Sequence, residues 1–498
     1  MTSYKALLER LATIHDLGMV NAVLGWDQQT EMPHGGNAAR ARQLGTVAGI
    51  QHELMTDDET GKLLEASAKE LGEPDYDSTE ASMLRIAQHD YEQATRLPSK
   101  FVSEWAVETT LSHEVWAKAR AEQNFSLFQP KLEKLVDMTL QMAEYLGYDE
   151  HPYDALLGQY ERGITTAQVE KIFSEHRPAL VDLIAAIAEK PQVNDDFLHL
   201  DFDIDTQRDF ANKMVSAFGF DFNRGVQAEA VHPFCTNFSI NDVRITTRFN
   251  EDWLNPALFG MMHEAGHAMY EQGVNQALEG TFLAGGTSLG VHESQSRMWE
   301  NIVGRSKSFW SWALPQLKAS FPQLANVDLD TFYKGINKVE RSFIRVEADE
   351  ATYNLHIILR FELETAILEG KLKVKDLPEA WNAKFTEFFG ITPPNDALGV
   401  LQDVHWSAGL MGYFPTYALG NLLSVQYFNQ ALAAHPNLED EFAQGKFDNL
   451  LSWLNENIHT HGRKYTSDEL TRSVTGESIQ SRDYIAYLQK KFGDVYGL

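Results

Sequence analysis

The sequence predicts a mainly α-helical protein, formed by a single large helical unit with a long cleft and a small antiparallel β-sheet. Three observations predict this fold class. Apolar residues recur at helical spacing from the start of the chain, as at Leu7, Leu8, Leu11 and Ile14. Only 16 prolines interrupt the 498 residues, so long helices are allowed. Alternation of apolar and polar residues, which is typical of a β-strand, is convincing only over residues 243–249.

The composition argues against several classes of partner. Lys and Arg number 42 and Asp and Glu 71, which gives a formal net charge of −29. Such an acidic chain is not expected to bind nucleic acid or an anionic membrane. No run approaches about 18 uncharged apolar residues, and the N-terminus lacks the apolar core of a signal peptide. The single cysteine, Cys235, rules out an internal disulfide and fits a reducing compartment. We therefore expect a cytoplasmic protein.

Taken in order, residues 1–200 predict a series of helices that covers the cleft. Residues 26–36, WDQQTEMPHGG, are the one early stretch rich in polar and turn residues, and they form either a helix–helix connection or a loop that lines the cleft. Residues 192–206 form an acidic break. We expect one domain, residues 1–498, in which residues 201–498 carry the functional site.

The β signal follows this break. In VRITTRF, positions 243, 245, 247 and 249 share an apolar face, and the polar face includes Asp242 and Arg244. With FCTNFS before it and IND as a turn, the segment predicts a hairpin that leads into the next helix. An edge strand there could bind a peptide by strand addition. Alternatively, the hairpin is structural and its arginines face solvent.

A helix over residues 255–273 carries the motif around which the chain is organised. Asn255 is its predicted N-cap and Gly273 supplies the stop. His263 and His267 are four residues apart, so they lie on one face of the helix, where two imidazoles can bind one metal ion.

Glu264 stands between these histidines, where it can accept a proton from a water activated by the metal rather than bind the ion itself. This HExxH pattern predicts a catalytic zinc site with water at the fourth position. The alternative is a buried helix whose two histidines only form hydrogen bonds. Gly260 and Gly266 would each weaken the helix by about 1 kcal/mol relative to Ala, so we expect close packing or a nearby ligand at both.

The third metal ligand must come from outside this motif. The extended pattern HExxHxxGxxH is absent, because Tyr270 and Gly273 stand where its Gly and its third His should be. Glu271 is about 12 Å along the helix axis from His263, which is too far for both to bind one ion.

Glu293, in GVHESQSRMWEN, is the better candidate, and His292 is its nearest rival. The segment predicts a second helix that follows a Gly-rich loop at 284–290 and ends at Gly304. Zinc is then held by His263, His267 and Glu293.

The sequence IRVEAD carries a candidate for substrate binding. Arg345 and Asp349 are four residues apart, so one interpretation is an intrahelical ion pair worth only ~0.3–0.5 kcal/mol. The other is that the Arg345 guanidinium binds a terminal carboxylate through two parallel hydrogen bonds, which suits Arg better than Lys.

Residues 388–420 contain a Pro-rich loop followed by LGVLQDVHWSAGLMGYFPTYALG. His405 and Tyr413, with Tyr417 as a reserve, could donate hydrogen bonds to a tetrahedral oxyanion. The alternative is that these residues only pack with aromatic neighbours such as Trp406.

The chain resembles the carboxypeptidase Taq family of metallocarboxypeptidases over nearly its whole length. The resemblance rests on an ordered set of motifs: WDQQTEMP at 26–33, HPF at 232–234, DVRIT at 242–246, HEAGH at 263–267, HESQS at 292–296, IRVEAD at 344–349 and GVLQDVHW at 399–406. The chain departs from the family at 225–230, where GVQAEA replaces the family's Gly-Arg-x-Asp-x-Ser run.

The resemblance implies a metallocarboxypeptidase that releases single C-terminal amino acids from peptides with broad specificity and acts as a homodimer. It implies one zinc ion per chain, with cobalt as the alternative metal. It also favours Arg345 as the residue that binds the substrate's carboxylate, with Gln402 nearby and Arg244 as the alternative cation. Two other functions stay open: a zinc oligopeptidase that cleaves internal bonds, and an acidic helical binding scaffold, against which the intact Glu264 argues.

Overall fold

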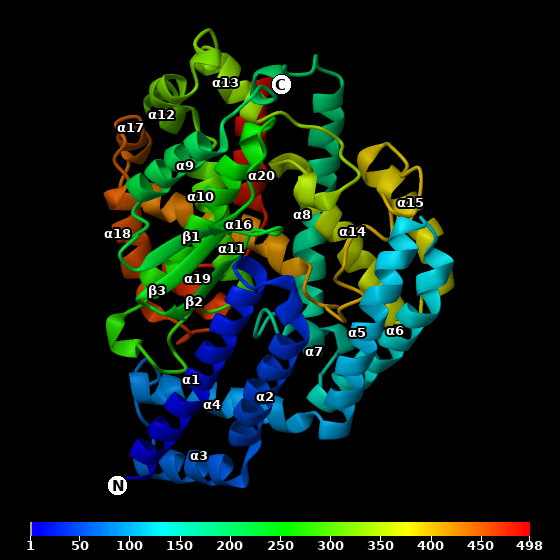
Figure 1. The fold of residues 1–498 in the computed structure, drawn as a ribbon, viewed down its shortest axis with the longest axis vertical. Coiled ribbons are helices and arrows are strands. Elements are labelled where there is room, and N and C mark those ends of the chain that lie inside the picture. Colours follow the sequence, from blue (N-terminus) through cyan, green and yellow to red (C-terminus); the bar gives the residue numbers. More distant parts are fainter. Residues whose placement is uncertain (1) are drawn as a thin grey trace. The chain divides into compact units, whose positions relative to one another are not determined.

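The computed structural model of the chain describes residues 2–498 and consists mostly of helices (Figure 1). The predicted mainly helical fold with one small sheet is confirmed. The chain divides into two compact units of three segments each. The first unit comprises Met1–Thr95, Asn194–Ile336 and Gln426–Ser478, and the second comprises Arg96–Val193, Asn337–Val425 and Ile479–Leu498. Both units therefore draw residues from either side of residue 200.

The first unit contains the sheet. Its elements are α1 (Ser3–Thr30), α2 (Asn37–Thr56), α3 (Asp58–Leu71), α4 (Thr79–Arg96), α9 (Ile204–Phe218), β1 (Gly225–Glu229), β2 (Cys235–Ser239), β3 (Asp242–Thr247), α10 (Leu254–Gln272), α11 (Leu289–Arg297), the π-helix η4 (Met298–Val303), α12 (Lys307–Ser320), α13 (Leu329–Ile336), α17 (Leu438–Phe442), α18 (Asp448–Asn457) and α19 (Ser467–Thr475). Helix α1 takes in residues 26–30 of the early polar stretch, and a short 3-10 turn at 34–36 follows.

An apolar core within the first unit joins its N-terminal helices to the segments around the sheet and α10. Leu7 and Leu11 of α1 are buried in one cluster with Ile240, between β2 and β3, and with Val274 and Leu278, which follow α10. Full burial of a leucine stabilises a fold by roughly 1.5–3 kcal/mol. The helical spacing of α1 thus buries its apolar face as the sequence predicts.

The second unit is helical in all of its regular elements within residues 2–498. They are α5 (Ser99–Ala121), α6 (Phe125–Leu146), α7 (Pro152–Leu157), α8 (Thr166–Ala188), α14 (Glu350–Leu368), α15 (Leu377–Phe389), the first half of α16 (Pro415–Ala434) and α20 (Arg482–Tyr496). Helix α14 packs against α8 and α15, and α20 also packs against α8.

The sheet is mixed, which corrects the predicted antiparallel sheet. Strand β2 pairs antiparallel with β3 as predicted, but β1 lies on the other side of β3 and runs parallel to it, with Val226 opposite Arg244. The segment GVQAE is not predicted as a strand, because five residues are too few for a clear alternation. On β3 the predicted face is confirmed, since Val243 and Ile245 are fully buried.

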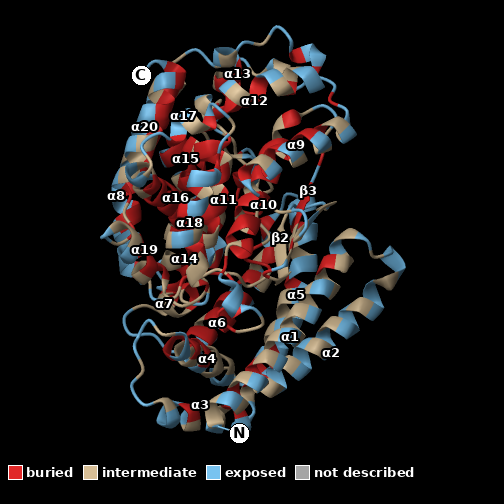
Figure 2. Ribbon diagram, turned by 90° about the vertical axis from the view of Figure 1, so that its left-hand side faces the viewer, coloured by how far each residue is buried: buried red, intermediate tan, exposed pale blue. Residues whose placement is uncertain are grey.

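The helices that follow the sheet are extensively buried. Helices α10 and α11 are largely red in Figure 2, whereas α2 is mostly tan and pale blue and buries only Met55. Helix α10 packs on β2, β3 and α11. The HEAGH motif therefore lies in a well-packed part of the first unit.

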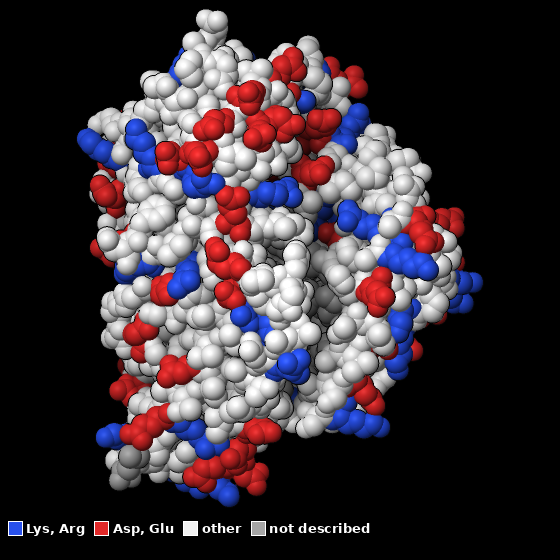
Figure 3. Space-filling model, viewed as in Figure 1, with Lys and Arg blue, Asp and Glu red and all other residues white. Residues whose placement is uncertain are grey.

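The surface carries charges of both signs. On the face shown in Figure 3, Lys and Arg side chains are interspersed among the more numerous Asp and Glu side chains. Among residues 2–498, every helix is too short or too polar to cross a lipid bilayer.

Candidate functional site

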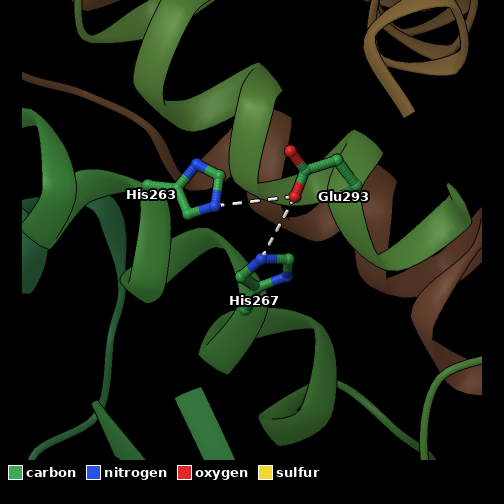
Figure 4. A group of neighbouring side chains, drawn as sticks. All are labelled: His263, His267 and Glu293. Atoms are coloured by element: carbon green, nitrogen blue, oxygen red, sulfur yellow. Dashed lines mark ion pairs between the residues drawn. The ribbon is translucent and has the colours of Figure 1, made fainter. Parts of the chain in front are cut away.

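Helices α10 and α11 bring the three predicted metal ligands together. His263 and His267 lie one turn apart on α10, and Glu293 faces them from α11 (Figure 4). The Nε2 atoms of both histidines are 3.5 Å from Glu293 Oε2. The ligand atoms of the three side chains all lie within 4.8 Å of one another, and no other group of three or more His, Cys, Asp or Glu residues within 2–498 is arranged in this way.

The start of α10 differs from the prediction, whereas its end agrees. The helix begins at Leu254 with Trp253 as its N-cap, so Asn255 lies inside the first turn and its buried Oδ1 has no hydrogen-bond partner among the described residues. The helix starts here because the backbone of Trp253 is extended. The preference for polar N-cap residues does not predict a tryptophan at this position. Gly273 ends the helix as predicted, and Gly304 ends the α11–η4 run.

Gly266 explains how closely the two helices approach. A Cβ atom at this position would lie 2.6 Å from Gln295 O and 2.6 Å from Ser296 Cα on α11. At Gly260, by contrast, a Cβ would meet only Thr247 Oγ1, at 3.8 Å. Close packing therefore accounts for Gly266, as predicted, but not for Gly260.

The remaining nitrogen of each histidine is held by a neighbour. His263 Nδ1 lies 2.9 Å from Glu300 Oε2, and His267 Nδ1 lies 2.6 Å from His292 Nδ1. Both Nε2 atoms are thereby directed toward Glu293 (Figure 4). Two ligand atoms bound tetrahedrally at about 2.0–2.2 Å from one ion are separated by roughly 3.3 Å. Two imidazole nitrogens and a carboxylate oxygen at these separations fit a zinc ion.

The charges around Glu293 favour its ionised form. Burial alone would raise the pKa of Glu293, but the positive charges of Arg297 and His263 and a hydrogen bond with His267 hold it well below its usual range. Arg297 Nε donates to Glu293 Oε1 at 2.7 Å, while its Nη1 donates to Glu300 Oε2 at 3.2 Å. Residues 293, 297 and 300 share one helix face.

The pKa values of the two histidines are shifted in opposite directions. Burial lowers the pKa of His267 to about 3, so its ring is neutral at pH 7 and offers a lone pair. Burial would also lower the pKa of His263, but the charge of Glu293 and the hydrogen bond with Glu300 raise it above its usual value. A metal ion binds each ring in its unprotonated form.

Glu264 is buried beside the three candidate ligands. Only 6% of its surface is exposed. Burial raises its pKa to about 7, and the negative charges of Glu293 and Glu300 add to this while His263 opposes it. A carboxyl group that titrates near neutral pH suits a general base.

Several residues around the ligands were not predicted. Arg297 donates hydrogen bonds to both Glu293 and Glu300. The spacing of these residues, four and then three positions along a helix, is the signal that could have found them. Glu271, excluded as a ligand by its distance, does not join the cluster but accepts a hydrogen bond at 2.7 Å from His292, the rival ligand. This link crosses from α10 to α11, so no local pattern shows it.

Arg345 lies in the second unit, and the backbone around it rules out the expected intrahelical ion pair with Asp349. It belongs to a short 3-10 turn, Arg345–Glu347, while Asp349 is the N-cap of α14 and accepts from Ala351 N and Thr352 N. The extended backbone at Ala348 separates them, so the expected intrahelical ion pair does not form.

Arg345 is held by side chains from other segments instead. Its Nε and Nη2 donate to Asp403 Oδ1 at 3.0 and 2.9 Å, and its Nη1 donates to the Tyr353 hydroxyl at 2.8 Å. Arg360, fully buried, pairs with the other Asp403 oxygen. Only 5% of Arg345 is exposed, so the guanidinium is fixed in place before any ligand arrives.

The other predicted residues of the second unit lie around this pair. Gln402 Oε1 accepts from Arg345 N at 2.9 Å, and its Nε2 donates to Phe343 O at 2.9 Å. His405 Nδ1 is buried without a hydrogen-bond partner among residues 2–498, and burial lowers the pKa of His405 to about 4. The ring of Tyr413 lies 5.5 Å from that of His405. The structure thus groups Arg345, Gln402, His405 and Tyr413.

Arg244 is separate from this group and belongs to the first unit. On β3 its Nε and Nη2 donate to Asp242 at 2.8 and 2.9 Å. Its guanidinium carbon lies 4.8 Å from the ring centre of Phe238 and 5.6 Å from that of Trp26. Arg244 is thus half-buried rather than simply turned to solvent.

Known proteins match the chain over nearly its whole length. Residues 6–492 match the family model of the carboxypeptidase Taq (M32) metallopeptidases. The chain is 40% identical over 511 residues to thermostable carboxypeptidase 1 of Thermus thermophilus, and 36% identical over 499 residues to carboxypeptidase 1 of Bacillus subtilis; each match covers 99% of both chains.

Solved structures show the same fold. The M32 carboxypeptidase of Deinococcus radiodurans R1 superposes with a TM-score of 0.97 at 43% identity and covers 100% of both chains. Metallocarboxypeptidase 1 of Trypanosoma cruzi gives a TM-score of 0.94 at 31% identity, with 98% of this chain and 99% of that chain covered. The chain therefore belongs to the carboxypeptidase Taq (M32) family of metallopeptidases and is a metallocarboxypeptidase that hydrolyses peptides.

Proposed function

We propose that this metallocarboxypeptidase holds one zinc ion through His263, His267 and Glu293 and releases single C-terminal amino acids from peptides with broad specificity. The observation that carries the proposal is the convergence of two Nε2 atoms on Glu293 Oε2, each at 3.5 Å. The contacts of the two Nδ1 atoms support it, because they leave both Nε2 atoms available. Zinc is proposed because two imidazole nitrogens and one carboxylate are a common donor set of catalytic zinc sites.

Zinc, when bound, would polarise the scissile carbonyl and make a water molecule more acidic. Glu264 accepts the proton of the attacking water and passes it to the leaving amine. A pKa of about 7, raised by burial, supports this role, since the group can both take and return a proton near neutral pH. His405 and Tyr413 donate hydrogen bonds to the oxyanion, and Tyr417 is the reserve.

Arg345 is proposed to bind the terminal carboxylate of the substrate. A guanidinium has five N–H donors, and three of those of Arg345 donate to Asp403 and Tyr353. Among residues 2–498 the other two have no hydrogen-bond acceptor and can bind a carboxylate. Gln402 contributes to substrate binding indirectly, because its Oε1 accepts a hydrogen bond from the backbone N–H of Arg345 and so holds that residue in place. Arg244, whose guanidinium is engaged by Asp242, is the alternative cation.

The test is to digest a free-acid peptide and its C-terminal amide and to read both products by mass spectrometry. Wild type should remove one residue at a time from the free acid and act poorly on the amide. Arg345→Ala should lose about 2–4 kcal/mol of transition-state binding on the free acid, which corresponds to roughly 30- to 900-fold in kcat/KM. Arg345→Lys keeps the charge but not the two-pronged geometry, so most of the loss should remain.

Arg244→Ala is the parallel variant, and it should keep the preference for the free acid. Thermal unfolding of each variant shows whether the fold is retained. If wild type cuts the amide at internal bonds and Arg345→Ala changes nothing, the proposed substrate contact is wrong and cleavage is that of an oligopeptidase.

A further inference from the structure

His292 connects one candidate zinc ligand to a carboxylate that is too distant to be a ligand. Its Nδ1 lies 2.6 Å from His267 Nδ1, and its Nε2 lies 2.7 Å from Glu271 Oε1. The three side chains form a continuous row of hydrogen bonds, His267–His292–Glu271. The row begins and ends on α10 and passes through α11.

The direction of each hydrogen bond follows from the ligand role of His267. If Nε2 of His267 gives its lone pair to the metal, then Nδ1 of the neutral ring carries the hydrogen. That N–H donates to Nδ1 of His292, which must therefore be the acceptor nitrogen. His292 then carries its hydrogen on Nε2 and donates it to the Glu271 carboxylate. One tautomer of each ring satisfies all contacts.

Glu271 is itself held in place by two further donors. Gly286 N donates to its Oε1 at 3.0 Å, and Asn237 Nδ2 donates to its Oε2 at 2.8 Å. Gly286 also makes room for the row, because a Cβ there would lie 2.5 Å from His292 Cδ2. Strand β2 and the Gly-rich loop before α11 thus fix the carboxylate. Only 5% of Glu271 is exposed, so little water competes for its oxygens.

We propose that His292 and Glu271 are positioning residues that fix His267 in its Nδ1–H tautomer and strengthen its Nε2 as a metal ligand. The proposal rests on the proposed function, because it takes His267 as a ligand. A carboxylate that accepts the outer N–H of a metal-bound imidazole orients the ring and raises its basicity. At His263 the Glu300 carboxylate makes this contact directly, whereas at His267 an imidazole relays it.

The test measures the Zn²⁺ dissociation constant by competition with a chelator, together with the thermal unfolding of the metal-free protein. Glu271→Gln removes the charge and keeps the size, and Asn237 can rotate its amide to match. His292→Leu keeps the volume but breaks the row. Both should weaken Zn²⁺ binding by about 10- to 100-fold, the range for such outer contacts. The melting temperature of the metal-free Glu271→Gln protein should stay near that of wild type.

Two controls separate this effect from packing and from net charge. His292→Gln restores an acceptor toward His267 and a donor toward Glu271, so its Zn²⁺ affinity should recover most of the loss seen in His292→Leu. Glu279 accepts from Ile240 N and lines the same cavity as Glu271. Because it is outside the row, Glu279→Gln should bind Zn²⁺ like wild type.

Zn²⁺ binding as tight as wild type in His292→Leu overturns the proposal, and so does an equal loss in Glu279→Gln and Glu271→Gln. His267→Ala distinguishes these results from failure of the proposed function. If His267→Ala loses zinc while His292→Leu keeps it, the site stands and only the relay is wrong. If His267→Ala itself keeps zinc, the ligand assignment fails.

Discussion

Two buried carboxyl groups of the first unit, Glu264 and Glu293, have pKa values displaced in opposite directions. Burial dominates at Glu264 and raises its pKa to about 7. At Glu293 the same effect is overcome by Arg297 and His263, which hold the pKa well below its usual range. Groups with pKa values separated in this way serve different roles. Glu293 is suited to bind a cation permanently, and Glu264 to exchange a proton.

This division of roles predicts that one variant loses turnover but keeps zinc, whereas the other loses zinc. Glu264→Gln keeps size and hydrogen bonding but cannot accept a proton, so kcat should fall by at least ~100-fold while zinc content stays near that of wild type. Glu293→Ala removes a ligand and should lower zinc content itself. Metal analysis of the purified proteins and steady-state kinetics check both. Fast turnover by Glu264→Gln, or full zinc retention by Glu293→Ala, contradicts the assignment.

At the residue scale, the sequence predicts the contacts that a helix repeat determines. His263 and His267 are brought together by the four-residue spacing, and Glu293 was favoured because Glu271 on α10 lies too far along the axis. The links from His292 to Glu271 and from Arg345 to Asp403 were not predicted, because they join separate segments. The expected pair of Arg345 with Asp349 does not form for a local reason: the backbone at Ala348 is extended, so the two residues do not share a helix.

At the scale of elements, the site depends on how near α11 lies to α10. The nearest atoms to a Cβ at Gly266 belong to the α11 backbone, at 2.6 Å. A side chain could rotate away from such a contact, but a backbone cannot. The distance between the helices, and with it the position of Glu293 relative to the two histidines, is therefore limited by the absence of a side chain at Gly266.

Gly266→Ala and Gly260→Ala form a matched pair on one helix. Both substitutions should gain about 1 kcal/mol of helix propensity. Gly266→Ala must also push α11 away, at an overpacking cost that we expect near the upper end of about 1–3 kcal/mol, so the metal-free protein should unfold at lower temperature and bind zinc more weakly. Gly260→Ala, with ordinary contact at 3.8 Å, should be as stable as wild type or more so.

Calorimetry of the two metal-free variants and zinc competition check this prediction. A Gly266→Ala protein with wild-type zinc affinity would show that α11 does not need to approach so closely. Loss of stability in Gly260→Ala would point instead to a role of that glycine that its open surroundings do not reveal.

Strand pairing is the part of the fold that local patterns describe least well. The β2–β3 hairpin was predictable because its turn is short and β3 alternates. Strands β1 and β3 are neighbours in the sheet, with Gly225 opposite Val243, although β2 lies between them in the sequence. A parallel pairing of this kind leaves no turn signature between the partners, so the sheet was predicted as antiparallel.

At the scale of the whole molecule, the chain alternates between its two compact units. Each unit consists of three segments, and each includes residues from before and after residue 200. In the first unit, Leu7 and Leu11 share a core with Ile240 and Val274. The predicted parts 1–200 and 201–498 are therefore joined within the first core, and the same holds for the second.

In the second unit, α8 supplies buried partners to α14. His176 Nε2 lies 3.0 Å from Asn354 Nδ2, with both side chains fully buried, and Arg177 pairs with Glu362 at 2.6 Å. The rings of Phe173 and Phe361 are 5.2 Å apart. Removal of α8 would expose the ring of Phe361 and would take away the hydrogen bond between His176 and Asn354.

The fragment 201–498 should therefore fail to fold, although it contains HEAGH, HESQS and Arg345. It lacks α1 from one core and α8 from the other, and buried polar groups that lose a partner each cost about 1–3 kcal/mol. We expect it to show no cooperative thermal transition, weak near-ultraviolet circular dichroism and no tight zinc binding, whereas the full chain should melt cooperatively, give a strong near-ultraviolet signal and bind zinc tightly. Co-expression with residues 1–200 is the informative control, because recovery of zinc binding in the pair would show that the missing helices, and not the cut itself, are responsible. A fragment 201–498 that melts cooperatively and binds zinc like the full chain would instead establish it as an independent catalytic part.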